Sequence, residues 1–183
     1  MKPITLLTTV LLMLAFNAAQ AAEFVTLSQQ HTSEALIVTP EFKLVLSDEI
    51  EEAINSGIVI TFVIQARLMD EVNWWFDRSI SSKLQTFKLR YFSLSRQYEL
   101  NNISQKSIQT FVTLDLLLDH LSTKTEFQFE LSTNTDYIET RLFLDKQALP
   151  STMQLPIVFD PDWNINSDWQ KTEIESLKVT NNP

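Results

Sequence analysis

A scarcity of glycine is the feature that most restricts what this chain can fold into. Gly57 is the only glycine in 183 residues. Phosphate-binding loops, dinucleotide-binding turns and the nucleophile elbow of hydrolases all need several glycines, because their backbones approach a ligand closely or adopt positive φ. The sequence therefore excludes these three kinds of site, and no residue is predicted to be catalytic.

Alternation of apolar and polar side chains dominates the chain and is typical of β-strands with one buried face. The run at 58–69 begins as a continuous apolar sequence and is predicted to be the central strand. Pro40 indicates an edge strand or a bulge. Two strands at 127–131 and 138–144 are predicted to form a hairpin. Further strands are predicted at 24–29, 35–46, 83–94, 98–100 and 108–111, with weaker ones at 153–159 and 172–179.

Two short helices interrupt this pattern. Ser47 is the expected N-cap of the first helix, and Gly57 is expected at its C′ position with positive φ. Thr113 is expected to cap the second helix, which carries a leucine stripe at helical spacing. Together the elements predict a mainly β fold, a single-domain antiparallel β-sandwich with two short helices, over residues 22–183.

The first 21 residues have the form of a signal peptide. Lys2 precedes an apolar run from Ile4 to Phe16, and Ala19-Gln20-Ala21 has the small-x-small form of a cleavage site. The run is roughly 20 Å long as a helix, which is short for a membrane span. We therefore expect cleavage and a periplasmic location. The alternative is an uncleaved anchor, and we expect membrane contact only in that case.

Charge and metal-ligating residues restrict the ligands further. The net charge of −9 argues against nucleic acid as a partner. The chain has two histidines and no cysteine, so the usual zinc ligands are scarce. Oxygen-bearing side chains recur at every second position from Asp160 to Asp168, as in a calcium loop, but Ile165 and Lys171 stand where that loop needs glycine and glutamate. We expect no metal, no cofactor and no enzymatic activity.

Aromatic and arginine residues are the remaining candidates for recognition. The four tryptophans are either plugs of the core or, if exposed, a stacking platform. Arginines beside aromatics, Arg90 and Arg141 among them, could serve recognition or pack by cation–π contact. Arg96, beside Tyr98, is expected to fasten the sheet edge through hydrogen bonds. The candidate binding residues are Trp74, Trp75, Arg78, Arg96, Tyr98, Trp163 and Trp169.

Several short motifs together resemble a known family. They are Gly57-Ile-Val-Ile-Thr-Phe, Trp74-Trp75-Phe76-Asp77, Leu89-Arg90-Tyr91, Leu94-Ser95-Arg96-Gln97-Tyr98, Leu149-Pro150 and Trp163-x-x-x-Ser167-x-Trp169. In this order they resemble the proteobacterial "domain of unknown function 4390" family. The resemblance implies a small exported protein whose gene often lies near a sensor kinase and response regulator, and it implies no activity.

Three classes of function follow from these observations. We expect a non-enzymatic periplasmic interaction module, whose partner is an envelope protein such as the extracytoplasmic part of a sensor kinase. The alternatives are a small-ligand or glycan-binding module that uses the tryptophans, and an uncharacterised hydrolase.

Overall fold

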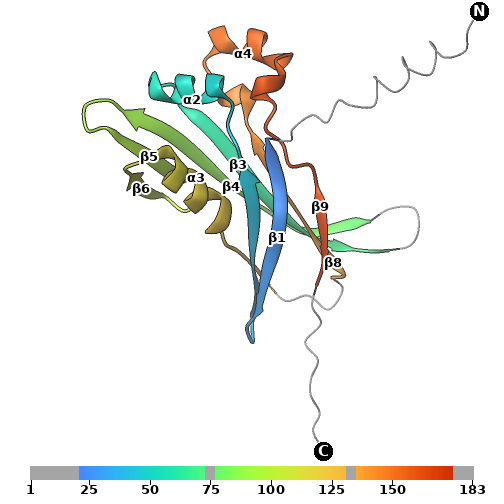
Figure 1. Ribbon diagram of the computed structural model, residues 1–183. Helices are drawn as coiled ribbons and strands as arrows, with labels where there is room; N and C mark the ends of the chain where they lie inside the picture. The colour runs from blue at the N-terminus through green and yellow to red at the C-terminus, as the bar shows by residue number, and fades with distance from the viewer. Residues whose placement is uncertain (1–20, 73–76, 131–134, 175–183) are drawn as a thin grey trace, which may run out of the picture.

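The computed structural model describes residues 21–72, 77–130 and 135–174 (Figure 1). The strands in these ranges form two antiparallel sheets, which confirms the predicted mainly β, sandwich-like fold. The smaller sheet has the order β1-β2-β7, with β1 (Ala22–His31), β2 (Ala35–Leu44) and β7 (Phe127–Glu130). The larger sheet has the order β6-β5-β4-β3-β8-β9, with β3 (Ile60–Asp70), β4 (Arg78–Phe92), β5 (Gln97–Asn102), β6 (Ser107–Phe111), β8 (Tyr137–Leu144) and β9 (Gln170–Glu173).

Strand β3 is the central strand, as its apolar run predicted. It pairs with β4 on one side and with β8 on the other. Ile60, Phe62 and Ile64 are fully buried on the face that meets the smaller sheet, and Thr61 and Val63 are also buried on the opposite face. Burial on both faces explains why this part of the strand reads as a continuous apolar run.

The predicted hairpin of 127–131 and 138–144 is wrong. Strand β7 pairs with β2 in the smaller sheet, whereas β8 pairs with β3 and β9 in the larger one. Phe127 and Phe129 lie beside Val38 and Leu36 of β2 and are buried in the core. The alternation therefore predicted the buried faces of both strands, but side-chain alternation carries no information about the partner strand.

Pro40 lies where one edge of β2 has no partner strand. It is opposite Leu27 of β1, while β7 pairs only with Ala35–Val38 of β2. The missing N–H of proline is tolerated at such an edge, as predicted. A bulge is present too, but in the neighbouring strand β1, between Phe24 and Thr26.

Both predicted helices are present, with the predicted caps. Helix α2 (Asp48–Asn55) begins after Ser47, whose hydroxyl accepts a hydrogen bond from the Ile50 N–H. Helix α3 (Leu114–Thr123) begins after Thr113, which accepts from the Leu116 N–H. Its buried residues include Leu114, Leu117, Leu118 and Leu121, and the helix packs against β2, β5 and β6.

A third helix, α4 (Ser151–Val158), replaces the strand predicted at 153–159. Figure 1 shows α4 beside α2 at one end of the molecule. Two single-turn 3₁₀ helices flank α4, η1 (Lys146–Ala148) and η2 (Pro161–Trp163). The free edge of β8 is occupied by the segment that follows: Phe143 bridges to Asn166, and the Leu144 N–H donates to the Ile165 carbonyl. Residues 153–159 therefore have no sheet edge there to join.

The predicted strand at 172–179 is present only in part. Strand β9 ends at Glu173, and residues 175–179 lie outside the described residues. Among the helices that the structure describes, none has the length and apolar character needed to cross a membrane.

Candidate functional site

One face of the larger sheet points away from the core, and we call it the outer face. The inward side chains of β3, β4 and β8 pack against the smaller sheet and α3. The outward side chains include Leu84 and Ile108, which are 55% and 60% exposed. Leu84 lies on β4 and Ile108 on the edge strand β6, so the outer face presents apolar side chains at two places to a binding partner.

Two arginines and one tryptophan form a stacked group on the outer face, and we call Arg67, Arg141 and Trp169 the arginine–tryptophan cluster. Arg67 lies on β3, Arg141 lies on the neighbouring strand β8, and Trp169 directly precedes β9. The guanidinium carbons of Arg67 and Arg141 lie 3.8 and 4.4 Å from the centroid of the Trp169 ring. Both distances are within the range in which the π-face of an indole attracts a cation.

The two arginines differ in their polar partners. Arg67 Nε donates a 2.7 Å hydrogen bond to Glu139, with which it also forms an ion pair. Arg141 donates through Nε and Nη2 to the neutral side-chain oxygen of Gln65, at 3.3 and 3.1 Å. Burial lowers the pKa of Arg141, and the positive charge of Arg67 lowers it further. In the part of the chain that the structure describes, Arg141 has no carboxylate partner.

A tight turn ahead of Trp169 holds the indole in this position. Asp168 has φ of 55° and accepts a 2.9 Å hydrogen bond from the Asn166 amide. The Ser167 hydroxyl is buried, accepts from the Leu142 N–H at 2.9 Å and donates to the Asp168 carbonyl. These bonds tie the turn to β8 and place Trp169 beside Arg141.

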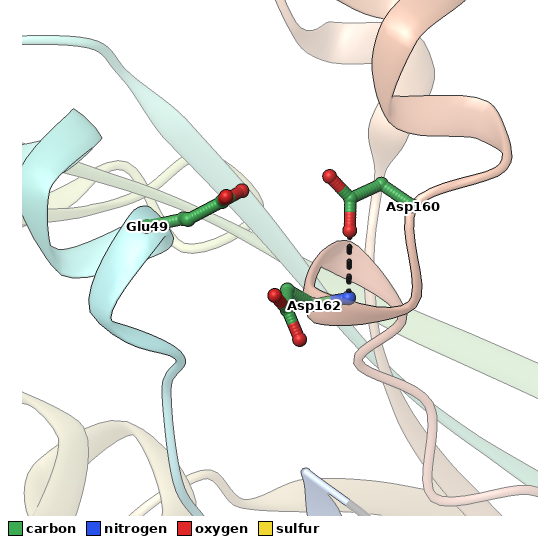
Figure 2. Close-up of side chains that lie close together, drawn as sticks. All are labelled: Glu49, Asp160 and Asp162. Atoms are coloured by element: carbon green, nitrogen blue, oxygen red, sulfur yellow. Dashed lines mark hydrogen bonds between the residues drawn. The ribbon is translucent and has the colours of Figure 1, made fainter.

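A second group of charged residues lies near α2. Figure 2 shows Glu49 of α2 facing Asp160 and Asp162 of the η2 turn, and their carboxylate oxygens lie within 4.8 Å of one another. Asp160 also accepts a 3.0 Å hydrogen bond from the Asp162 N–H, and Glu49 accepts one of 3.1 Å from the Trp163 indole. Carboxylates are ligands for hard cations, but exposed acidic groups of this kind are common without one.

The calcium-like order from Asp160 to Asp168 does not fold into one loop. Asp160 and Asp162 cluster with Glu49, whereas Asn166 and Asp168 hydrogen-bond to each other in the turn before Trp169. The oxygen-bearing residues that recur at every second position from Asp160 to Asp168 therefore lie in two separate turns.

A small polar pocket lies between α3 and strands β4, β5 and β6. Its floor includes Gln85 and Asn102, joined by a buried 2.7 Å hydrogen bond, and its rim includes His120 and Lys124. Burial lowers the pKa of His120, and the Lys124 charge lowers it further, while Asp119 opposes both effects. Neither Trp163 nor Trp169, the two tryptophans among the described residues, lines this pocket.

Trp163 and Trp169, the two tryptophans that the structure describes, do not form a shared platform. Trp163 is 4% exposed and belongs to the core, while Trp169 is half-buried on the outer face. Trp74 and Trp75 lie outside the described residues. Of these two, Trp163 is therefore a core residue and Trp169 a residue of the outer face.

The predicted polar candidates are also dispersed. Arg78 pairs with Asp70 at 2.7 Å at the exposed end of β4. Tyr98 donates to Asn55. Arg96 is exposed in the β4–β5 turn with φ of 54°, and its side chain makes no hydrogen bond or ion pair with the described residues. The predicted fastening role of Arg96 is therefore wrong, because the turn directs its side chain into solvent.

Arg67 was not among the residues predicted to take part in recognition. It lies within the apolar run of the central strand, where Gln65 and Arg67 occupy alternate positions. That polar alternation is the signal that could have indicated an open face. Trp169 is one of the predicted binding residues, and Arg141 is one of the arginines beside aromatics that the sequence indicates for recognition or cation–π packing.

A family model described as a domain of unknown function (DUF4390) matches residues 19–173. No curated protein and no solved structure matches the chain.

Proposed function

The chain belongs to the family of the domain of unknown function DUF4390, and from this premise we propose that it is an exported, periplasmic, non-enzymatic interaction module. Its partner is a protein of the cell envelope, and the extracytoplasmic part of a sensor kinase is the first candidate. The partner binds on the outer face of the larger sheet.

The observation that carries this proposal is the composition of the outer face. It combines exposed Leu84 and Ile108 with the arginine–tryptophan cluster, in a protein whose net charge is −9. Apolar side chains beside Arg and Trp are characteristic of the centre of protein–protein interfaces. A concentration of cations in an otherwise acidic protein favours a partner whose matching surface is acidic.

Export is supported by the signal-peptide form of residues 1–21. N-terminal sequencing of the protein from the periplasmic fraction should begin at Ala22 or within a residue or two of it. Recovery of only the full-length chain, in membranes, would contradict this part of the proposal and would indicate an anchor.

The interaction is tested by affinity capture from the envelope of the native host, followed by identification of the bound proteins. The test variant is Leu84→Asp on the outer face. The matched control is Leu116→Asp on α3, because Leu84 and Leu116 are similarly exposed, 55% and 52%, and both variants add one negative charge. We expect Leu84→Asp to lose the captured partner and Leu116→Asp to keep it. Equal capture by both variants would mean that the outer face is not the interface.

A small-ligand function is the second candidate, and the polar pocket beneath α3 favours it. Its lining has hydrogen-bonding side chains above the apolar residues Phe87 and Leu100, which suits a small polar ligand. Titration with a panel of monosaccharides and amino acids, followed by NMR of the His120 and Gln109 signals, tests it. Saturable shifts that His120→Ala abolishes would support this function, and their absence for the whole panel would argue against it.

A further inference from the structure

The arginine–tryptophan cluster contains a cation that lacks a counter-charge. Resting on the proposed function, we propose that Arg141 is the binding site for a carboxylate of the partner protein, an Asp or Glu side chain, with Trp169 as the platform that holds the guanidinium in place.

The hydrogen bonds of Arg141 leave donors available. A guanidinium has five N–H donors in a planar fork. Arg141 uses Nε and Nη2 toward the single oxygen of Gln65. Its other N–H groups have no partner among the residues that the structure describes. A carboxylate matches this geometry, since it can accept two parallel hydrogen bonds from one guanidinium.

The charges around Arg141 also favour an anion. Glu139 lies two residues before Arg141 on the same face of β8, and it is already paired with Arg67. Arg67 and Arg141 both contact the Trp169 ring, and Glu139 is hydrogen-bonded to Arg67. These groups together carry two positive charges and one negative charge. On the same face, Lys171 lies 3.7 Å from Glu71, which adds one further charge of each sign. Arg67, Arg141 and Glu139 together therefore carry a net positive charge, and the Arg67–Glu139 ion pair leaves the Arg141 charge without a partner in this group.

The position of Arg141 reduces the entropic cost of binding. Its guanidinium carbon lies 4.6 Å from the centroid of Phe143 and 4.4 Å from that of Trp169. The side chain is half-buried and contacts both rings, so it is partly dehydrated and restricted in motion before any ligand arrives. A flexible surface arginine would lose rotamer freedom on binding, whereas this one has already lost it.

The test is an NMR titration of the ¹⁵N-labelled protein with a peptide of five glutamates. The matched peptide has five glutamines. The signals followed are the Arg141 Nε–H and the Trp169 indole N–H, the latter assigned with Trp169→Phe. We expect saturable shifts of both signals with the glutamate peptide and none with the glutamine peptide. Equal shifts with both peptides, or no shift with either, would overturn the proposal.

Arg141→Gln should weaken binding of the glutamate peptide by about tenfold or more, since it removes both the charge and the fork. Arg90→Gln is the matched control. Arg90 lies in the same sheet, its guanidinium carbon is 4.6 Å from the centroid of Phe92, and its substitution removes the same charge. It should change the affinity by less than about twofold. Equal losses in both variants would show a general charge effect and would overturn the assignment.

Two further arms complete the test. Arg141→Lys keeps the charge and loses the planar fork. It replaces Arg141→Gln as the test variant if Arg141→Gln does not fold. We expect it to bind the glutamate peptide more weakly than wild type, and full retention would contradict the bidentate contact. Inorganic phosphate at equal ionic strength should shift the two signals less than the peptide does. Tighter binding of phosphate would replace the carboxylate assignment.

Failure of this inference is distinguishable from failure of the proposed function. Envelope capture that depends on Leu84, without binding of the glutamate peptide, would refute the carboxylate site alone. Binding of the peptide at Arg141, without any captured partner, would refute the interaction module alone.

Discussion

The phenol of Tyr98 on β5 donates a 2.7 Å hydrogen bond to the side-chain oxygen of Asn55, the last residue of α2. The Tyr98 ring also lies 4.8 Å from that of Tyr91 on the neighbouring strand β4. Burial raises the pKa of Tyr98, and the nearby Tyr91 raises it further. This bond fastens α2 to the larger sheet. Tyr98 therefore makes the kind of anchoring hydrogen bond that was predicted for Arg96.

Tyr98→Phe should lower the free energy of unfolding by about 0.5–1.5 kcal/mol, because it removes one hydrogen bond and keeps the ring contact. Urea denaturation measures the loss. Asn55→Ala removes the same bond from the other side, so the double variant should lose less than the sum of the two single variants. Strictly additive losses would mean that the two residues do not interact in solution.

Tyr137 should make the protein sensitive to alkaline pH. It is 2% exposed, and its hydroxyl donates to the Asp77 carboxylate. Burial raises the pKa of Tyr137 well above its usual range, and the bond to Asp77 and the charge of Glu139 add to this. The folded state thus keeps the neutral phenol at pH values where the unfolded chain, with a pKa of about 10, loses its proton.

The stability that Tyr137 contributes is therefore complete below about pH 10 and is lost as the pH rises toward its folded-state pKa. Unfolding measured by urea between pH 8 and pH 11 should show this decline in wild type and a shallower one in Tyr137→Phe. Tyr98 has a shift of the same direction, so the double variant with Tyr98→Phe should be flatter still. An identical slope in wild type and Tyr137→Phe would contradict the assignment.

Gly57 ends α2 in the left-handed conformation that the sequence predicted. Its φ is +86°, its N–H donates to the Ile54 carbonyl, and the next N–H, of Ile58, donates to Ala53. These are the two bonds of a Schellman motif. A Cβ at this position would meet no atom within 4 Å, so the cost of substitution comes from the backbone conformation alone.

Gly57→Val should lower the free energy of unfolding by about 1–2 kcal/mol, because a branched side chain disfavours positive φ. The shift in thermal midpoint checks this. Gly57→Asn should lose less, since asparagine tolerates the left-handed region better. A midpoint for Gly57→Val equal to that of wild type would show that the helix does not end in this way.

Ser167 completes the edge of β8 where no regular strand is present. It is 1% exposed, and its hydroxyl accepts from the Leu142 N–H at 2.9 Å. Ser167→Ala leaves that N–H buried without a partner and should cost about 1–3 kcal/mol of stability. Because the turn positions Trp169, its indole NMR signal should shift as well.

The control for Ser167→Ala is Ser79→Ala, since Ser79 is exposed on β4 and makes no side-chain hydrogen bond within the described residues. We expect Ser79→Ala to change stability by less than about 0.5 kcal/mol. Equal stability of the Ser167 and Ser79 variants would mean that solvent replaces the Ser167 hydroxyl.

Local features of the fold were predictable from the sequence because their causes lie within a few residues. The Ser47 and Thr113 caps each bind an N–H three residues later, and Gly57 accepts the positive φ that ends α2. The alternation of apolar side chains likewise records which face of a strand is buried. These patterns sufficed for the mainly β fold and the central strand β3.

Long-range choices were decided only by the tertiary structure. Strand β7 pairs with β2 and not with its neighbour in sequence, because alternation selects a buried face and not a partner. Residues 153–158 lie in helix α4 and not in a strand, and the edge of β8 is taken by the segment around Asn166. Arg67, Arg141 and Trp169 meet because β3 and β8 are neighbours and the Ser167 turn lies against β8. No local pattern encodes that meeting, since it depends on how the whole core pairs its strands.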